Sequence, residues 1–293
     1  MSAYSLFSDA TARQESPVSL NLEQATSLIT DRAKQLVNQL INDRGHDEPP
    51  FLPEELAHLQ GIKPIVRADL GKTSAVLLRF HDSYVIKVNQ NHSLARQNFS
   101  CAHEIGHILF NELKLERYIR SIEYRTFNPQ GEQKARAAAR ERLCDAAATE
   151  LLMPELVFGK YLSGFGVSVH SIERLANIFR VSIRAAAWRI AEVSVEPCIT
   201  LLWQLWGRSK PKGLRFMWRV GPGRESRSKA NYIPVHTLVR YPSKLHRAYE
   251  HASPVKSSKL FKVDNVIKRL PMESKGFGHG DARRVISLAF LGR

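Results

Sequence analysis

The sequence lacks any long uninterrupted run of apolar residues. No stretch approaches the roughly 18 to 20 residues that a membrane span requires, and the first twenty residues lack the apolar segment of a secretory signal. Cysteine is also scarce, because Cys101, Cys144 and Cys198 are too few and too irregularly spaced for a disulfide framework. These absences argue against a membrane protein and against a secreted disulfide-rich domain, and they predict a cytoplasmic protein.

Acidic residues are scarce in the last third of the chain. Residues 1–197 contain 23 Lys and Arg against 23 Asp and Glu, whereas residues 198–293 contain 20 against 5. The formal net charge of +15 therefore lies entirely in the last third. Such a density of like charge favours a polyanion, such as nucleic acid, or an acidic protein surface as partner, although a role in solubility is the alternative. The step in charge predicts a domain boundary near residue 197.

What remains is an ordinary globular composition, with 43% hydrophobic and 24% charged residues over 293 positions, enough for two domains. Helical periodicity and capping signals predict helices at residues 22–45, 54–60, 93–113, 132–153, 171–179 and 182–193. Strands are predicted at 62–67, 75–80, 84–89, 199–206, 214–220 and 283–291, with long irregular stretches between the last two. The strand at 84–89 is either a sheet edge to which an extended substrate could add or an ordinary core strand.

The helix predicted at 93–113 carries an HExxH motif, His103 to His107. Residues four apart lie on the same helix face, so His103 and His107 can present ring nitrogens to one metal ion. Glu104 is too close in sequence to be a comfortable third ligand, but it can reach a water in the open metal position. The next helix offers Glu141 as a ligand and, four residues later, Asp145 as a carboxylate that orients a ligating imidazole. We predict a Zn²⁺ site here, with two hydrogen-bonded histidines on an ordinary helix as the alternative.

Three segments together resemble the ImmA/IrrE family of zinc metallopeptidases: residues 96–107, 141–145 and 150–154. In that family the HExxH motif supplies two zinc ligands and the catalytic glutamate, and a downstream motif supplies the third ligand. The resemblance implies that His103, His107 and Glu141 are the zinc ligands and that Glu104 is the catalytic glutamate. Asp145 would contact a ligand rather than the ion. The family's proteins cleave DNA-binding repressors and thereby induce genes.

Pattern, charge and resemblance together predict an α+β fold with three parts, of which the resemblance covers only the second. We expect a flexible arm at residues 1–19, a mainly helical zincin-like metallopeptidase domain with a small β-sheet at 20–197, and a small basic α+β domain at 198–293 that senses a signal or recruits a partner. The implied function is zinc-dependent endopeptidase, with a helix-turn-helix transcriptional repressor as the protein substrate. The alternative is a zinc-stabilised DNA-binding regulator without proteolytic activity.

Several other signals stay open at this point. The helices at 171–190 resemble a helix-turn-helix, but Ala185 to Ala187 are a poor surface for reading bases, so packing against the core is preferred. Aromatic residues alternate with basic ones around 203–219 and fit either a stacking surface for single-stranded nucleic acid or a sheet with one apolar face. Cys144 fits either a redox-sensitive thiol near the metal or a small core residue. The candidates for an oxyanion donor are Tyr118, Tyr124 and His170.

Overall fold

The structure is a computed structural model that describes residues 22–62, 64–81, 83–121, 129–207, 212–222, 233–234, 237–263 and 266–292. The predicted arm at 1–19 lies outside these residues. Helices and two β-sheets are both present, which confirms the α+β class. No helix within the described ranges is long and apolar enough to cross a membrane.

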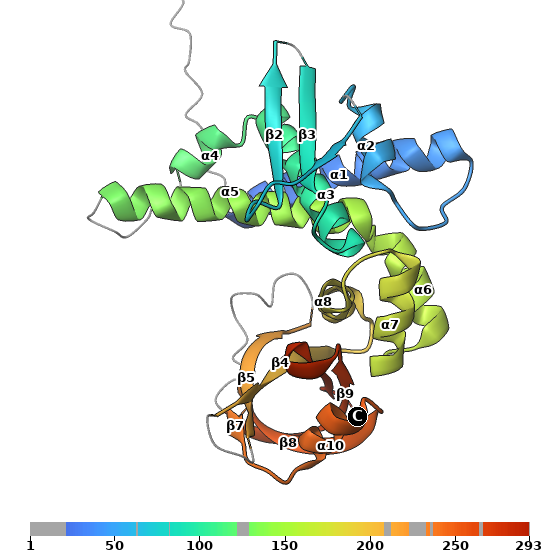
Figure 1. The fold of residues 1–293 in the computed structure, drawn as a ribbon, viewed down its shortest axis with the longest axis vertical. Helices are drawn as coiled ribbons and strands as arrows, with labels where there is room; N and C mark the ends of the chain where they lie inside the picture. The colour runs from blue at the N-terminus through green and yellow to red at the C-terminus, as the bar shows by residue number, and fades with distance from the viewer. Residues whose placement is uncertain are drawn as a thin grey trace, which may run out of the picture.

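The first part of the chain combines long helices with a small sheet (Figure 1). Its elements are α1 (Leu22–Arg44), α2 (Pro53–Leu59), β1 (Val66–Ala68), β2 (Ala75–Phe80), β3 (Ser83–Asn89), α3 (Leu94–Glu112), α4 (Glu116–Ser121) and α5 (Pro129–Leu152). Three shorter helices follow, α6 (Glu155–Phe165), α7 (Val169–Ile178) and α8 (Ile183–Val193). Of these, α6 is not predicted by the sequence, because Pro154 indicates the end of the preceding helix. Proline is also common at the start of a helix, and here Pro154 directly precedes α6.

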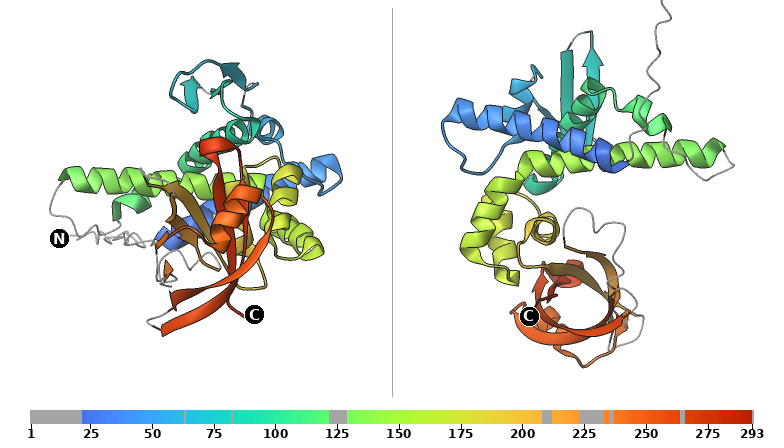
Figure 2. Two further views of the ribbon diagram at one scale, coloured as in Figure 1. Left: turned by 60° about the horizontal axis from the view of Figure 1, so that its bottom comes forward. Right: turned by 180° about the vertical axis from the view of Figure 1, so that it is seen from behind.

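The helices α1, α3 and α5 pack against one another, as the view from behind in Figure 2 shows for α1 and α5, and α3 also packs against β2 and β3 of the small sheet. Apolar residues of α1 recur every three or four positions and are fully buried, for example Ile29, Leu36 and Leu40. Gly45 ends the helix in the left-handed region at φ 72° and donates its N–H to the carbonyl of Ile41. The local pattern therefore accounts for both the buried face and the end of α1.

The small sheet has the strand order β1-β3-β2. The central strand is β3, which pairs in parallel with β1 and in antiparallel fashion with β2. Residues 84–89 therefore form a core strand, the second of the two interpretations, and not a sheet edge, because β1 pairs with the side of β3 that β2 leaves free. The strand with a free edge next to the HExxH helix is β2 instead.

The last third forms a second, seven-stranded sheet with the order β6-β8-β9-β10-β4-β5-β7. Its elements are β4 (Cys198–Trp206), β5 (Gly213–Val220), β6 (Ile233–Pro234), β7 (Leu238–Val239), α10 (Lys244–His251), β8 (Val255–Val263), β9 (Val266–Phe277), η1 (Gly280–Ala282) and β10 (Arg284–Phe290). The sheet curls around its own apolar core, and α10 lies against it (Figures 1 and 2).

The long strands β8 and β9 replace the irregular stretches predicted between residues 220 and 283. The sequence pattern did not predict these strands for two reasons. In β8, lysine and serine alternate with the inward-facing positions, and in β9, Pro271 interrupts the alternation. Pairing of β9 with β10 ends at Met272, so Pro271 lies where one side of β9 carries no β10 partner, a place where a strand tolerates proline.

The pair α7 and α8 connects the two parts. Six residues of α8 are buried, Ala186, Ala187, Arg189, Ile190, Ala191 and Glu192. Thr200 of β4 donates its hydroxyl to the carbonyl of Ala187, and the guanidinium of Arg184 lies over the ring of Trp218. Helix α8 is thus packed rather than exposed, as preferred, but it packs against β4 and β5 of the second sheet as well as against the peptidase core that was predicted as its partner.

The aromatic residues of the last third divide between core and surface. Trp203 is fully buried and donates its indole N–H to Ser287, while Trp206 is 50% exposed with the guanidinium of Arg215 over its ring. Phe216 packs against Trp203 inside the curled sheet. The preference for core positions therefore holds for Trp203 and Phe216 but not for Trp206. The basic residues Arg208 and Lys210 lie outside the described part of the chain.

Candidate metal centre

The candidate site lies where α3 and α5 cross in close contact. Gly106 of α3 makes this approach feasible, because a Cβ atom at that position would lie 2.9 Å from the carbonyl oxygen of Cys144 on α5. Around it, the helix buries Ala102, Ile105 and Leu109 against the core. These apolar neighbours fix the rotation of α3, so that the polar residues of the HExxH motif turn together toward α5.

Two histidines and a carboxylate converge at this crossing. Nε2 of His103 lies 3.1 Å from Oε2 of Glu141, and Nε2 of His107 lies 3.8 Å from Oε1 of the same carboxylate. The two imidazole rings meet nearly edge-on, with centroids 4.8 Å apart and an interplanar angle of 78°. One ligand atom from each of the three residues lies within 4.8 Å of the other two. The structure thus brings together the three side chains that were predicted as ligands.

The other nitrogen of each imidazole ring faces a residue of α5. Nδ1 of His103 lies 2.9 Å from Oδ1 of Asp145, and Nδ1 of His107 lies 3.3 Å from Sγ of Cys144. A carboxylate at Nδ1 accepts that N–H and leaves the lone pair of Nε2 directed at Glu141. Asp145 thus lies against Nδ1 of His103, and its role in orienting that ring stays a prediction.

Glu104 lies beside the cluster of His103, His107 and Glu141 and is not part of it. Its pKa is raised, chiefly by burial and also by the charge of Glu141, whereas His103 and a hydrogen bond from the backbone N–H of Leu77 oppose the shift. A carboxylate with a raised pKa accepts and releases protons nearer to neutral pH. Because Leu77 belongs to β2, the same contact places Glu104 against that strand.

The two histidines have unequal proton affinities. Burial opposes the protonated ring of His103, but the hydrogen bond to Asp145 and the charges of Asp145 and Glu141 outweigh it and raise the pKa. Burial and the neighbouring His103 lower the pKa of His107. The negative charge that surrounds His103 would equally attract a divalent cation.

The donor set fits a transition metal ion such as zinc. Zinc prefers imidazole nitrogen and carboxylate oxygen, and ligand atoms at about 2.1 Å in a tetrahedral site lie about 3.4 Å apart. The separations of 3.1 and 3.8 Å from Glu141 to the two Nε2 atoms bracket that value. Three protein ligands also leave a fourth position open, which is typical of catalytic rather than structural zinc.

Cys144 is buried against the site rather than exposed to solvent. Burial, together with the charges of Glu141 and Asp145, raises the pKa of its thiol. A thiol held in its neutral form is a poor nucleophile toward oxidants. The structure therefore favours the interpretation of Cys144 as a core residue that contacts His107 over that of a redox-sensitive thiol.

The two oxyanion candidates in the described residues, Tyr118 and His170, lie on other elements, α4 and α7. The ring of Tyr118 packs against the first hydrophobic core, His170 is exposed on α7, and Tyr124 lies outside the described residues. The oxyanion role of these three residues stays a prediction. Sequence reasoning missed the contacts of Leu77 with Glu104 and of Cys144 with His107; the second had a signal, since Cys144 lies between Glu141 and Asp145 on one helix.

Comparison with known proteins gives a family match over the same region. Residues 60–191 match the family model described as the IrrE N-terminal-like domain, Peptidase_M78. The radiation response metalloprotease IrrE of Deinococcus radiodurans is 34% identical over 116 residues, which are 39% of this chain and 33% of that relative. The match thus spans about a third of the relative's length. Both findings confirm the predicted resemblance to the ImmA/IrrE family.

A solved structure extends the likeness beyond this region. It is described as a Mycobacterium tuberculosis transcriptional regulator, and it superposes with a TM-score of 0.57 over 92% of this chain and 80% of its own. Sequence identity is 15%, so the likeness concerns the fold alone. Because nearly all of this chain is covered, it includes both the helical part and the curled sheet.

Proposed function

We propose that this protein is a zinc-dependent endopeptidase, because residues 60–191 match the IrrE N-terminal-like domain model and part of the same region is similar to a radiation response metalloprotease. The observation that carries the proposal is the convergence of His103, His107 and Glu141 beside a separate carboxylate, Glu104. Three ligands, an open fourth position and an adjacent general base are the parts that metal-assisted hydrolysis of a peptide bond requires.

In this proposal His103, His107 and Glu141 hold the ion, and Asp145 orients His103. When bound, zinc supplies Lewis acidity to the peptide carbonyl and acidity to a water molecule. Glu104 takes a proton from the attacking water and returns it to the departing amine nitrogen. The raised pKa of Glu104 suits both transfers, because a stronger base gains the proton readily and a still acidic group gives it up again.

The substrate main chain would lie along β2. This strand ends the small sheet, and Leu77 in its middle reaches Glu104 through its backbone N–H. An extended peptide that pairs with the free edge gains main-chain hydrogen bonds and passes next to the catalytic carboxylate. An edge strand beside the general base therefore supports a protein substrate rather than a small molecule.

The proposed substrate is a helix-turn-helix repressor, as the family resemblance implies, and the proposed place of action is the cytoplasm. The basic residues 198–293 would recruit it, either by contact with an acidic surface of the repressor or through the DNA to which the repressor is bound. Affinity of the full chain for operator DNA across a salt series separates the two routes. Binding through phosphates weakens steeply with salt, whereas salt-insensitive binding to the free repressor indicates protein recruitment.

The Glu104→Gln variant tests the enzyme assignment. It keeps the size of the side chain but cannot accept a proton, so zinc content should remain that of the wild type while repressor cleavage falls by about 10² to 10⁴. Zinc is measured by atomic absorption, and cleavage by gel analysis of a repressor encoded beside this gene. Glu112→Gln is the matched control, because Glu112 ends the same helix and pairs with Arg32 on the surface.

An unchanged cleavage rate in Glu104→Gln would exclude the peptidase. A zinc-loaded wild type that cleaves no repressor yet retards its operator DNA would favour the alternative, a zinc-stabilised DNA-binding regulator.

A further inference from the structure

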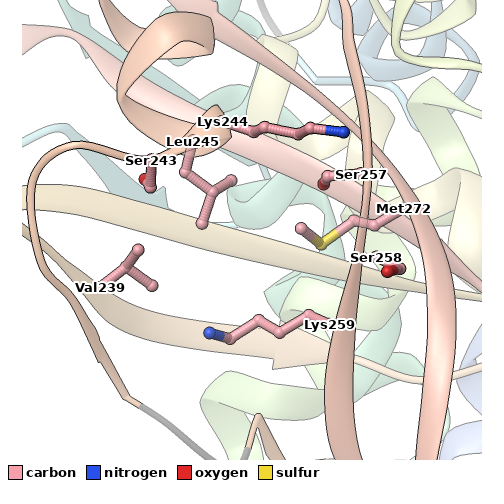
Figure 3. A pocket seen from close by; sticks show the side chains of 8 residues that line it. All are labelled: Val239, Ser243, Lys244, Leu245, Ser257, Ser258, Lys259 and Met272. Carbon is pink, nitrogen blue, oxygen red and sulfur yellow. The ribbon is translucent and has the colours of Figure 1, made fainter.

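A cavity of about 300 Å³ opens in the curled sheet, far along the chain from the metal centre. Its lining comes from β7, from the first turn of α10, from β8 and from β9 (Figure 3). The strand β7 is one end of the sheet, and β8 is separated from the other end only by the two-residue strand β6. The cavity therefore lies where the sheet approaches closure without completing a barrel, a place that commonly holds small molecules.

Lys259 brings a positive charge into this cavity. Alternation along β8 places Lys259 on the same face as the fully buried Phe261, which belongs to the core inside the sheet. Its ammonium lies 5.3 Å from the centre of the buried ring of Trp203, and Figure 3 shows the side chain extending from β8 toward Val239. Burial lowers its pKa below that of an ordinary lysine. The charge thus points inward rather than to bulk solvent.

Within the described residues, Lys259 makes no ion pair with a carboxylate. Its inward position differs from that of Lys256 and Lys262 on the outer face of the same strand, which are exposed. A half-buried ammonium costs free energy unless an anion or several hydrogen bonds compensate it. The contact with Trp203 supplies part of that compensation and leaves the side of the ammonium that faces the cavity available to a ligand.

A second polar group faces the same space without a partner. Ser257 precedes Lys259 by two residues and so lies on the same face of β8. Its Oγ atom is buried and has no hydrogen-bond partner, which is uncommon for a buried hydroxyl. The opposite wall is the start of α10, where the hydroxyl of Ser243 already caps the N–H of His246 and the helix dipole favours negative charge. Hydroxyl and ammonium therefore meet at one cavity beside a helix N-terminus, and both would be satisfied by an acceptor oxygen.

Of the other six lining residues, Val239, Leu245 and Met272 are apolar, whereas Ser243, Lys244 and Ser258 are polar or charged. Leu245 and Met272 are buried members of the core inside the sheet, and Val239 packs against it. An inorganic ion would satisfy the polar groups but leave this surface in contact with water. A ligand that covers the apolar walls as well gains the free energy of burying them.

We propose that this cavity binds a small organic anion, with its carboxylate or phosphate group against Lys259 and Ser257 and its apolar body against Val239, Leu245 and Met272. The site is separate from the metal centre and does not depend on proteolysis. A carboxylate and a phosphate group would be recognised in the same way, since each offers negatively charged acceptor oxygens.

The test uses the full chain and a set of naphthalene probes, 1-naphthoate, 1-naphthyl phosphate and the neutral 1-naphthalenemethanol. Isothermal titration should show binding of at least one anion about tenfold or more tighter than the neutral probe. The tighter of the two anions identifies the headgroup. Lys259→Met should remove the preference for the anion and leave binding of the neutral probe unchanged, while Ser257→Ala should weaken anion binding by a few-fold.

Lys256→Met is the matched control, because it removes the same charge from the exposed face of the same strand. The far-ultraviolet circular dichroism of Lys259→Met should equal that of the wild type, since methionine fills a similar volume. Equal affinities of 1-naphthoate and 1-naphthyl phosphate for Lys259→Met and Lys256→Met would overturn the proposal. So would full displacement of the probe by inorganic phosphate, or by a single-stranded oligonucleotide, which would assign the cavity to a simple ion or to nucleic acid.

Discussion

Nδ1 of His103 lies 2.9 Å from Oδ1 of Asp145, one helical turn beyond the carboxylate of Glu141 that Nε2 of the same ring faces at 3.1 Å. One imidazole thus bridges two acids that are four residues apart on α5. The spacing matters because residues four apart share a helix face. A single helix therefore supplies both a ligand and the group that orients another ligand, and their relative positions depend on no other element.

Removal of the orienting carboxylate should weaken metal binding without abolishing it. Asp145→Ala is expected to lower zinc affinity by about 10- to 100-fold, because the His103 ring loses the partner that fixes its tautomer and direction. Glu141→Ala removes a ligand and should lower the affinity further. Competition with a chromophoric chelator measures both.

Glu132→Ala on the same helix is the control for these two variants, since Glu132 pairs with Arg136 in the neighbouring turn, away from the histidines. If Asp145→Ala binds zinc as tightly as Glu132→Ala, the carboxylate does not orient His103. Full zinc occupancy in Glu141→Ala would move the third ligand to another residue.

Substitution of Gly106 at the crossing of α3 and α5 should disturb the metal site by forcing the two helices apart. In Gly106→Ala the new Cβ would lie 2.9 Å from the carbonyl oxygen of Cys144 and 3.1 Å from its Cα, both backbone atoms, so α3 and α5 must separate. Overpacking of this kind costs about 1 to 3 kcal/mol of the free energy of unfolding, and we expect weaker zinc binding with it. Urea unfolding and chelator competition measure the two effects.

Gly159→Ala makes the matched comparison, because a Cβ at Gly159 in α6 meets no atom within 4 Å. That variant should be neutral or up to about 1 kcal/mol more stable, since alanine favours the helix. Equal stability of the two alanine variants would show that the helices do not depend on the close approach at Gly106.

The buried charges at the end of α5 should be essential to stability. The guanidinium of Arg189 on α8 contacts Glu150 at 2.7 Å, Glu192 at 3.3 Å and the carbonyl of Met153 at 3.0 Å, and its side chain is 1% exposed. Arg189→Met leaves buried carboxylates without their cation and should cost about 3 to 5 kcal/mol. Urea unfolding would show this as a lower midpoint.

The same substitution at an exposed pair should have a small effect. Lys160→Met removes an ion pair with Asp47 whose side chains are 64% and 44% exposed, so we expect little or no change in the midpoint of urea unfolding. If Arg189→Met lowered the stability as little as Lys160→Met does, water or a rearrangement would have to satisfy the carboxylates of Glu150 and Glu192.

Lys259 should make stability depend on pH in the alkaline range. Its pKa in the folded protein is lowered by burial, so between that value and the ordinary lysine pKa of about 10.4 the unfolded chain binds more protons than the folded one. Stability must then rise with pH through this window. The free energy of unfolding of the wild type relative to Lys259→Met should therefore increase from about pH 7 to about pH 10.

Urea titrations at several pH values measure this difference, and groups common to both proteins cancel. Lys256→Met should track the wild type across the range, because Lys256 is exposed. Parallel curves for wild type and Lys259→Met would mean that the ammonium is solvated in the folded state.

The helices of the first part and the ligands of the site could be predicted because their signals are local. His103 and His107 share one helix, as do Glu141 and Asp145, and four-residue spacing specifies a common face without knowledge of the fold. The ends of α1, α7 and α8 are also local, since Gly45, Ser168 and Ser182 cap them with neighbouring backbone groups.

The sequence alone thus determined which residues could meet a metal ion and where the net charge lies. Only the tertiary structure decided that β3 is central and β2 is the free edge, because strand order depends on pairs such as Val66 with Lys87, far apart in the chain. It also decided that Lys259 points inward while Lys256 points outward. The local sequence allows either face of a strand to be buried. The packing of β4, β7 and α10 determines which face of β8 is enclosed.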